Sequence, residues 1–420
     1  MKAEPRRTWE PRKLDSLGFV GRGKSKHRPR NAPFLYDGPY PFVQTGDIKA
    51  ADLYLNEYSQ TYSEAGLAQS KLWEPGTLCI TIAANIAETA ILKIKACFPD
   101  SIVGFVADQA KCDVRFIKYY IDTIKLQMQN VSRGTTQDNL SVDKLLSFDF
   151  LTPPLPTQQK IAAILSAYDD LIENNSRRIQ LLETMAQALY REWFVNFRFP
   201  GHEQVKLVKS PLGMIPEGWK VKRCEEAVFI NPQTKVPKEG EKPFVPMGCL
   251  SNDSMLINDI ESRSGNSGSK FKNGDTLFAR ITPCLENGKT GFVQFLPSND
   301  DVAFGSTEFI VLRSATVCPE YVYLMARSHE FRDNAIKSMS GATGRQRVQE
   351  KCFDRFFIAQ PSPEVLKQFR QQVSPIFAAV QNLAKRNANL RQTRDLLLPK
   401  LISGEVDVSA LDINTAALAG

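Results

Sequence analysis

The sequence has few of the residues from which metal and disulfide sites are built. It contains three histidines, and its eight cysteines are scattered without a C-x-x-C pair. Zinc sites need clustered Cys and His ligands, so we expect no metal site. No apolar run approaches the roughly 18 residues of a membrane span, and no cationic and apolar leader opens the chain. Together with free thiols, these absences lead us to expect a cytoplasmic protein.

The charge is modestly positive. The formal net charge is +7, and residues 1–30 hold ten Lys and Arg against three Asp and Glu. Such a run is either a solvated arm or a contact with a polyanion. A chain of 420 residues with 42% hydrophobic residues is long enough for two or more domains.

One module occurs twice, about 200–210 residues apart. "PYPFVQTGDI" (39–48) is similar to "EKPFVPMGCL" (241–250), and "WEPGTLCITI" (73–82) is similar to "FKNGDTLFAR" (271–280). Each module contains short β-type runs separated by Gly, Pro, Asn and Asp. A repeat at this offset predicts two domains with similar tasks.

Each module ends at a proline cluster and continues into a long helical segment. Residues 157–197 contain no Pro and no Gly. Their apolar residues recur at alternating spacings of four and three, which is the pattern of a coiled-coil seam. The first seam comprises Ile161, Leu165, Ile172, Asn175, Ile179, Leu182, Leu189 and Trp193. The second comprises Phe369, Val373, Val380, Leu383, Asn387, Leu390 and Leu397.

The two seams have about equal length, so we expect them to pack together. An antiparallel pairing with Ile161 opposite Leu401 sets Trp193 against Phe369. It also sets Asn175 opposite Asn387, and such a polar pair would fix the register, although both asparagines could instead lie at a wet edge. We expect Pro375 and Pro399 to interrupt the second helix near its ends.

The predicted fold class is therefore α+β, with two similar mainly-β heads separated by two long antiparallel coiled-coil helices. Helices of about 40 residues are about 60 Å long, so they can act as a spacer. The predicted boundaries are a first head at 1–152, a central helix at 153–198, a linker and second head at 199–362, a C-terminal helix at 363–404 and a flexible tail at 405–420.

At this level of detail the chain resembles the specificity subunits of type I restriction-modification systems. The resemblance rests on "PPLPTQQKIAAILSAYDDLIENNSRRIQLLETMAQALYREWF" (153–194), "LLLPKLISGEV" (396–406), "SPLGMIPEGW" (210–219) and "GDTLFARITPCLENGKTGFV" (274–293). It covers almost the entire chain, in order and in duplicate.

The resemblance implies a DNA-binding, non-catalytic subunit. Each head would be a target recognition domain that reads one half of a split, asymmetric site in double-stranded DNA. Two modification methyltransferase subunits would dock on the helices and adjoining surfaces, and restriction subunits would join through them. This chain would bind no cofactor, while its partners would use S-adenosylmethionine, ATP and Mg²⁺.

Candidate DNA contacts are Lys, Arg and Gln residues in glycine-flanked loops. Phosphates attract Lys and Arg, whereas base edges are read by Arg, Lys, Asn and Gln. Any single surface cation can also be merely solvated. The candidates are Lys24, Lys26, Arg28, Arg30, Arg133 and Gln137 in the first head, and Arg280, Lys289, Arg345 and Arg347 in the second.

Two other classes of function compete with this interpretation. "GFVGRGKS" (18–25) fits the P-loop pattern, but the prolines that follow it argue against the helix that would receive a phosphate. No methyltransferase N-P-P-Y type turn is present. A two-headed scaffold for other proteins would share the helices, but it would not need basic loops in both heads.

Overall fold

The computed structural model describes residues 9–133, 139–413 and 415. The chain divides into two compact units. Unit 1 comprises residues 1–174 and 387–420, and unit 2 comprises residues 175–386. Each unit combines one head with part of both long helices, because the division falls inside those helices.

The two long helices are α6 (Leu155–Tyr190), which continues into the π-helical turn η2 (Arg191–Val195), and α10 (Pro363–Ile402). The strands of unit 1 are β1 (Glu10–Arg12), β2 (Gly18–Arg22), β3 (Tyr36–Phe42), β4 (Tyr54–Leu55), β5 (Gln60–Tyr62), β6 (Leu72–Trp73), β7 (Leu78–Thr81), β8 (Thr89–Leu92), β9 (Ala96–Cys97), β10 (Ile102–Ala107) and β11 (Phe150–Thr152). Its shorter helices are α1 (Leu14–Leu17), α2 (Thr45–Ala50), α3 (Glu64–Ala68), α4 (Val114–Arg133) and α5 (Val142–Ser147).

Unit 2 has a similar set of elements. Its strands are β12 (Leu207–Ser210), β13 (Gly213–Pro216), β14 (Lys220–Arg223), β15 (Val228–Ile230), β16 (Glu241–Val245), β17 (Glu261–Ser264), β18 (Ser269–Lys272), β19 (Thr276–Ala279), β20 (Thr290–Phe292), β21 (Val302–Gly305), β22 (Phe309–Ser314) and β23 (Phe357–Gln360). Its shorter helices are α7 (Cys224–Ala227), α8 (Pro319–Arg327) and α9 (His329–Lys337).

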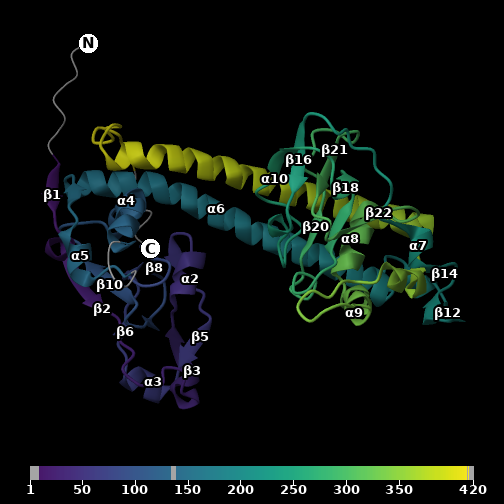
Figure 1. The fold of residues 1–420 in the computed structure, drawn as a ribbon, viewed down its shortest axis with the longest axis horizontal. Helices are drawn as coiled ribbons and strands as arrows, with labels where there is room; N and C mark the ends of the chain where they lie inside the picture. The colour runs from purple at the N-terminus through teal and green to yellow at the C-terminus, as the bar shows by residue number, and fades with distance from the viewer. Residues whose placement is uncertain (1–8, 134–138, 414, 416–420) are drawn as a thin grey trace, which may run out of the picture. The chain divides into compact units, whose positions relative to one another are not determined.

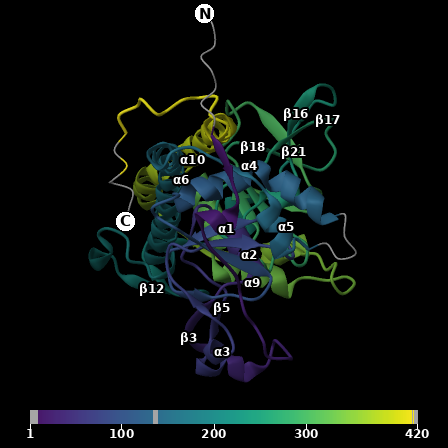
Figure 2. The ribbon, with the colours of Figure 1, turned by 90° about the vertical axis from the view of Figure 1, so that its left-hand side faces the viewer.

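The two heads share one strand order apart from the extra edge strand β4 of unit 1, which confirms the internal repeat. The first sheet runs β2-β10-β7-β8-β4 in unit 1 and β15-β22-β19-β20 in unit 2. The second sheet runs β5-β3-β9-β6 in unit 1 and β17-β16-β21-β18 in unit 2, and in both the pair at the centre is parallel. A two-stranded ladder, β1-β11 or β14-β23, closes each head. In unit 1, the second sheet and α3 lie at the end opposite the long helices (Figure 1, Figure 2).

The central strand of the first sheet is buried on both faces in each head. All four residues of β7 and all four of β19 are buried. Leu78 packs into the cluster that contains α4, whereas its neighbour Cys79 packs into the cluster with Trp73. Leu277 and Phe278 divide between two clusters of unit 2 in the same way. This burial explains the continuous apolar runs, since strands covered on both faces lose the alternating pattern.

In unit 1, the start of α6 and the end of α10 run antiparallel, side by side (Figure 1, Figure 2). Ile161 and Leu401 belong to one core cluster, as the predicted pairing requires. Further along, Asn387 donates from Nδ2 to the carbonyl of Ile172 at 3.3 Å. Leu165 is fully buried in the same cluster. The buried seam therefore joins both helices to the first head.

In unit 2, the end of α6 packs on the start of α10, and the two helices are again antiparallel. The rings of Trp193 and Phe369 have centroids 5.6 Å apart. The other seam residues of unit 2 are buried or partly buried in one cluster with the second head, and they are Ile179, Leu182, Leu189, Val373, Val380 and Leu383. Leu390 and Leu397 of unit 1 are half-buried. Asn175 and Asn387 lie in different units, so their pairing stays a prediction.

The expected interruption of the second helix is wrong. α10 continues from Pro363 to Ile402 through both Pro375 and Pro399. Each proline removes one backbone donor from the helix, which costs stability at an interior position. Burial of Val373 and Phe377 on either side of Pro375 offsets that cost by holding the turn against the head.

Candidate nucleic-acid interface

In unit 1, the strand order brings four loops to one edge of the first sheet. The amide of Gly23, after β2, donates to the carbonyl of Ile102 at 2.8 Å. The amide of Ile82, after β7, donates to Ser101 at 2.9 Å, and the amide of Leu140 donates to Ile82 at 2.8 Å. We call this surface loop edge 1, and within the described residues it comprises 23–32, 82–88, 98–101 and 139–141.

Unit 2 builds the same edge from the corresponding loops. The amide of Asn231 donates to Val311 at 2.8 Å, and the amide of Arg280 donates to Glu308 at 3.0 Å. The amide of Val348 in turn donates to the carbonyl of Arg280 at 2.9 Å. We call this surface loop edge 2, and it comprises 231–238, 280–289, 305–308 and 340–348. All predicted candidates of the second head lie on it.

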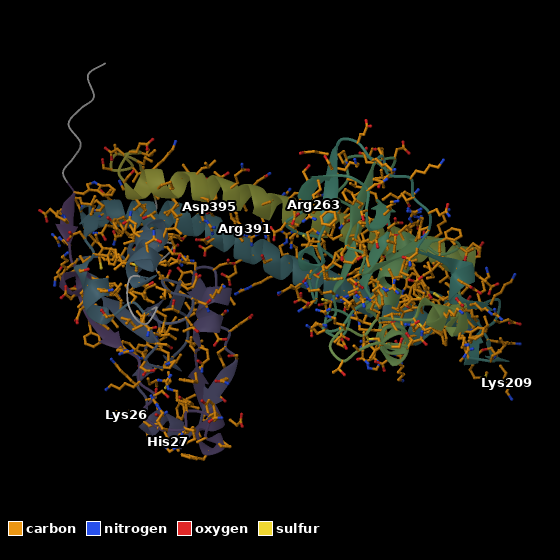
Figure 3. All side chains as sticks on the ribbon, viewed as in Figure 1. Lys26, His27, Lys209, Arg263, Arg391 and Asp395 are labelled. Atoms are coloured by element: carbon orange, nitrogen blue, oxygen red, sulfur yellow. The ribbon has the colours of Figure 1, made fainter. Side chains whose placement is uncertain are left out.

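The four basic candidates after β2 differ in how far they are committed to the fold. Lys24 and Lys26 are exposed, and within the described part of the chain neither ammonium has a hydrogen-bond or ion-pair partner. Arg28 donates to two backbone carbonyls of its own loop. Arg30 lies 2.8 and 2.9 Å from the carboxylate oxygens of Asp100. Lys24 and Lys26 are therefore the candidates available to a ligand, and Figure 3 shows Lys26 at the end of unit 1 away from α10.

The last two candidates of the first head are placed only in part. Arg133 is the final residue of α4, and Gln137 lies outside the described residues. The segment resumes at Asn139, which forms an antiparallel bridge with Ala83. The backbone that follows this segment therefore belongs to loop edge 1.

Of the three candidate arginines in loop edge 2, two are ion-paired, and only one has a side chain without a partner among the described residues. Arg280 donates to the carboxylate of Glu350 at 2.9 Å. Arg347 pairs through two nitrogens with Glu308, and this bonding raises the pKa of Arg347. Arg345 is exposed, and no described residue accepts a hydrogen bond from its side chain. Arg280 and Arg347 thus shape the loops, whereas Arg345 is available to a partner.

Lys289 is the last residue of the loop between β19 and β20, which begins at Arg280. Its ammonium donates to the carbonyl of Met247 at 3.0 Å, so it ties the loop to the second sheet. The bridge between Ile281 and Arg347 brings the backbone of Arg280 and Arg347 together, whereas Lys289 has a structural contact.

Three lysines on or beside the loop edges were missed by the sequence analysis. The Lys71 ammonium lies 3.6 Å from the ring centroid of Trp73, and burial together with nearby Lys24 lowers the pKa of Lys71. Lys235 and Lys270 lie on the rim of a pocket in loop edge 2. Lys71 and Lys270 each shortly precede a glycine turn, in "SKLW" (70–73) and "SKFK" (269–272), although the strand register does not make them counterparts in the repeat.

The loop between β7 and β8 adopts an uncommon backbone conformation. Ala84, Asn85 and Ala87 have φ angles of 47°, 42° and 63°. Alanine rarely takes this left-handed conformation, so the surroundings must hold it. The hydroxyl of Thr81 donates to the carbonyl of Asn85 at 2.5 Å, and an amide from α4 donates to the same loop. Loop edge 1 is therefore preorganised by the head beneath it.

The corresponding loop of unit 2 is held by two arginines. Arg327 donates to the carbonyl of Gly288 at 2.9 Å, and Arg332 donates to Leu285 at 2.8 Å and to Thr290 at 2.9 Å. Burial and the neighbouring Arg327 charge lower the pKa of Arg332 to about 10. In both heads, the helices that follow the first sheet thus bind the carbonyls of the loop they support.

The P-loop pattern is not a phosphate site. Gly18–Arg22 form an antiparallel edge strand, and no helix follows it before a short 3₁₀ turn at Pro33–Leu35. The amides of Gly23 and Lys24 are already bonded to backbone carbonyls. A side chain at Gly23 would lie 2.2 Å from the carbonyl oxygen of Pro99, so glycine is needed for close packing. The pattern is therefore coincidental.

The described residues hold no cluster of metal ligands that would compete with the loop edges. Within residues 9–133, 139–413 and 415, no three His, Cys, Asp or Glu side chains gather in a way that could hold a metal ion. The cysteines are free thiols, and burial raises the pKa of most of them. None of the described helices is both long and apolar enough to cross a membrane.

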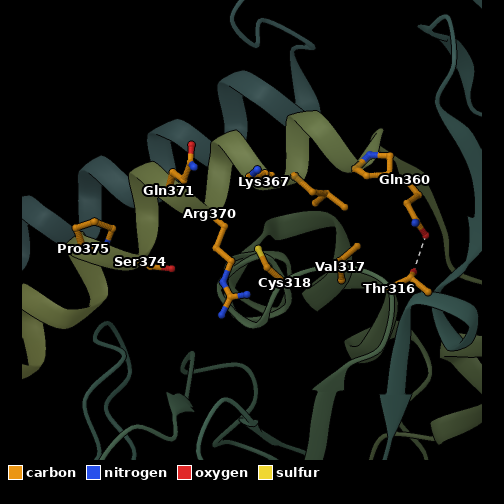
Figure 4. Close-up of a pocket in the computed structure, with 11 residues that line it drawn as sticks. Thr316, Val317, Cys318, Gln360, Lys367, Arg370, Gln371, Ser374 and Pro375 are labelled. Atoms are coloured by element: carbon orange, nitrogen blue, oxygen red, sulfur yellow. Dashed lines mark hydrogen bonds between the residues drawn. The ribbon is translucent and has the colours of Figure 1, made fainter.

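A groove of about 720 Å³ lies on the first turns of α10, away from loop edge 2 (Figure 4). Thr316 donates to Gln360 at 2.7 Å at one end of it, and Arg370 points from the helix towards Cys318. Nearby, Ser374 donates to buried Glu320. None of the predicted DNA candidates lines this groove.

Comparison with known proteins points to one class. Residues 6–184 match the family described as Type I restriction modification DNA specificity domain. The chain is 24% identical over 421 residues to the Type I restriction enzyme MjaIX specificity subunit of Methanocaldococcus jannaschii, covering 96% of this chain and 94% of that one. It is also 24% identical over 339 residues to the HindI specificity subunit of Haemophilus influenzae, covering 66% and 72%.

The fold is shared with a solved specificity subunit. The crystal structure of the type I restriction-modification S subunit from M. genitalium superposes with a TM-score of 0.57 at 14% identity, covering 96% of this chain and 98% of that chain. The α+β fold class is therefore confirmed. Together, these matches show that the chain is similar to type I restriction enzyme specificity subunits over 96% of its length and shares the fold of a solved one. The matched domain supports a role in DNA sequence recognition.

Proposed function

We propose that each head of this chain reads one part of a bipartite, asymmetric site in double-stranded DNA. The observation that carries the proposal is the repeated loop edge. Both heads present the corresponding loops on one strand order, but with different side chains on those loops. A common scaffold with different loops suits two readers of different sequences, because base readout depends on the side chains that reach the groove.

The two long helices act as the spacer between the readers. Two readers on one face of B-DNA are centred about 34–36 Å apart, or one helical turn. A helix of 40 residues, as α10 is, has a length of about 60 Å and can span that separation. The heads differ in sequence, so the two halves of the site differ as well.

Partner subunits supply the chemistry in this proposal. Two modification methyltransferase subunits dock on the helices, and restriction subunits join through them. Leu181 and Met185 support such docking, because they lie one turn apart on α6 with exposures of 64% and 54%. The partners bind S-adenosylmethionine, ATP and Mg²⁺, and this chain is non-catalytic. The complex acts in the cytoplasm, where it meets the DNA.

Salt-dependent binding tests the proposal against a protein scaffold. The chain is purified with its modification subunit and titrated with duplex DNA at several salt concentrations. A DNA reader loses affinity steeply as salt rises, with a slope of about −0.9 per phosphate contacted. Binding that is absent, or independent of salt and sequence, would instead favour the scaffold.

A further inference from the structure

Loop edge 2 contains a pocket of about 530 Å³. It opens between the segment after β15, the start of β18 and the turn before β22. Its lining residues are Asn231, Pro232, Gln233, Thr234, Lys235, Gly268, Ser269, Lys270, Arg280, Thr307, Phe309 and Val311. All of them belong to unit 2.

The strand register identifies the counterpart of this pocket in the first head. Gly21 pairs with Gly104 in unit 1, as Asn231 bonds with Val311 in unit 2. The β3–β9 and β16–β21 pairs align Phe42 with Phe244. Through the neighbouring strands β6 and β18, this alignment makes Ser269 the counterpart of Lys71 and Phe271 the counterpart of Trp73.

In the first head, a lysine side chain lies at the position that Ser269 takes in the second. The ammonium of Lys71 lies over the rings of both Trp73 and Phe19, at 3.6 and 4.6 Å from their centroids. In the second head, the hydroxyl of Ser269 instead turns to the carbonyl of Phe309 at 2.9 Å. The open pocket therefore occurs where the second head has the short side chain of Ser269 in place of Lys71.

The pocket is rich in hydrogen-bond donors and positive charge. No carboxylate is among its lining residues. Glu350 neutralises Arg280, but within the described residues Lys235 and Lys270 have no acidic partner. Thr234 is held in place by Arg313 at 2.9 Å. Two uncompensated ammonium groups beside hydroxyl and amide donors match an anion.

We propose that this pocket binds a backbone phosphate of duplex DNA through Lys235 and Lys270, and that the first head has no equivalent phosphate site. The inference rests on the proposed DNA-reading function and assigns one phosphate contact to the second head. A volume of about 530 Å³ has room for the phosphate together with an attached sugar. The contact positions the second head on the duplex and carries no base specificity.

The test uses the Lys235→Ala/Lys270→Ala double variant in complex with the modification subunit. Each lost phosphate contact makes the slope of log K against log salt less negative by about 0.9, so the double variant, which loses the one phosphate held by both lysines, shifts it by about 0.9. Affinity falls by the same factor on every DNA sequence, and the methylated motif stays unchanged. The matched control is Lys206→Ala/Lys209→Ala. Both lysines are exposed and lie outside loop edge 2, since Lys206 directly precedes β12 and Lys209 lies in it (Figure 3). The slope of this control stays at the wild-type value.

A second variant fills the pocket without removing a charge. Ser269→Lys introduces the residue of the first head and weakens DNA binding, although it raises the net charge. A double variant whose slope equals that of the control would overturn the phosphate site. An altered second half of the motif at an unchanged slope would overturn it too, because the lysines would then read bases. Wild-type complex that binds no DNA would contradict the proposed function itself, which separates the two failures.

Discussion

Trp193 of α6 packs against Phe369 of α10 within unit 2, with ring centroids 5.6 Å apart and an interplanar angle of 58°. The two residues are 4% and 0% exposed. The register that places Ile161 with Leu401 in unit 1 is the one that places these rings together. The helix pair is therefore continuous with the core of each head, and each head depends on the helices for part of its stability.

Truncation of the Trp193 ring tests this dependence. Trp193→Ala removes a buried aromatic side chain, so we expect unit 2 to lose about 3–5 kcal/mol of unfolding free energy. Urea unfolding followed by circular dichroism measures the loss. Gln372→Ala, at an exposed position of α10, is the control and should change stability by less than about 0.5 kcal/mol. Equal effects of the two substitutions would mean that the seam does not stabilise the head.

A buried polar network ties the first head to both long helices. Asp169 of α6 accepts a hydrogen bond from the Tyr119 hydroxyl at 2.5 Å and pairs with Arg394 of α10. Burial and the Asp169 charge raise the pKa of Tyr119 well above its usual value. Asp169 is 5% exposed, so loss of its cation leaves a charge with little water.

Arg394→Leu should therefore destabilise unit 1 by about 3 kcal/mol, because a buried carboxylate loses its partner. Arg391→Ala, one turn earlier and exposed, is the control (Figure 3). Adding Asp169→Asn to Arg394→Leu should recover part of the loss, since no charge then remains unpaired. Absence of any recovery would show that the pair acts through packing rather than charge.

Glu183 should make the stability of unit 2 depend on pH. Its carboxylate accepts from the amide of Met255 at 2.6 Å, but burial, the larger effect, raises its pKa above the usual 4.5. The folded state then holds the proton more tightly than the unfolded state. Stability from this group is fully present below about pH 4.5 and falls as pH rises through the folded pKa.

The Glu183→Gln variant removes this titration. The unfolding free energy of the variant should rise relative to that of the wild type as pH rises from about 4.5. The difference between the two should become constant above the pKa of Glu183 in the folded state. Urea unfolding between pH 4 and pH 8 follows the difference, with exposed Glu217→Gln as the control. A difference that does not change with pH would contradict the assignment.

Arg345 and Arg347 should differ in their effects although they are neighbours. Arg345→Ala removes a free cation, so it should make the salt slope of DNA binding less negative by about 1 and leave the melting temperature unchanged. Arg347→Ala strands Glu308 and should loosen loop edge 2, which lowers local protection from hydrogen exchange. If both variants changed only DNA binding, the ion pair would have no structural role.

Much of the architecture could be predicted from the sequence. The seam register, the repeat and the two-headed fold followed from periodic patterns that extend over many residues. The continuity of α10 through Pro375 did not follow, because tertiary packing of Phe377 and its neighbours outweighs the local cost of proline. The first and last residues of the strands could not be predicted either, because strands buried on both faces do not alternate between apolar and polar residues.

The candidate site was predicted less completely. Composition indicates which loops are basic, but it does not show which Lys or Arg side chain is bound to a carboxylate within the fold. Arg280 and Arg347 are bound to Glu350 and Glu308, which lie 70 and 39 residues away in sequence. The lysines that line the second-head pocket were missed because β18 brings Lys270 next to a distant loop. Such pairings depend on tertiary structure, which no local pattern reports.

The central claim is that each head reads one half of a split site, and a methylome tests it most directly. The chain is expressed with its modification subunit in a host without adenine methylation, and modified adenines are mapped by long-read sequencing. The account predicts a single asymmetric motif in two parts, separated by a gap of fixed length. A continuous motif, or no methylation despite a stable complex with the partner, would contradict it.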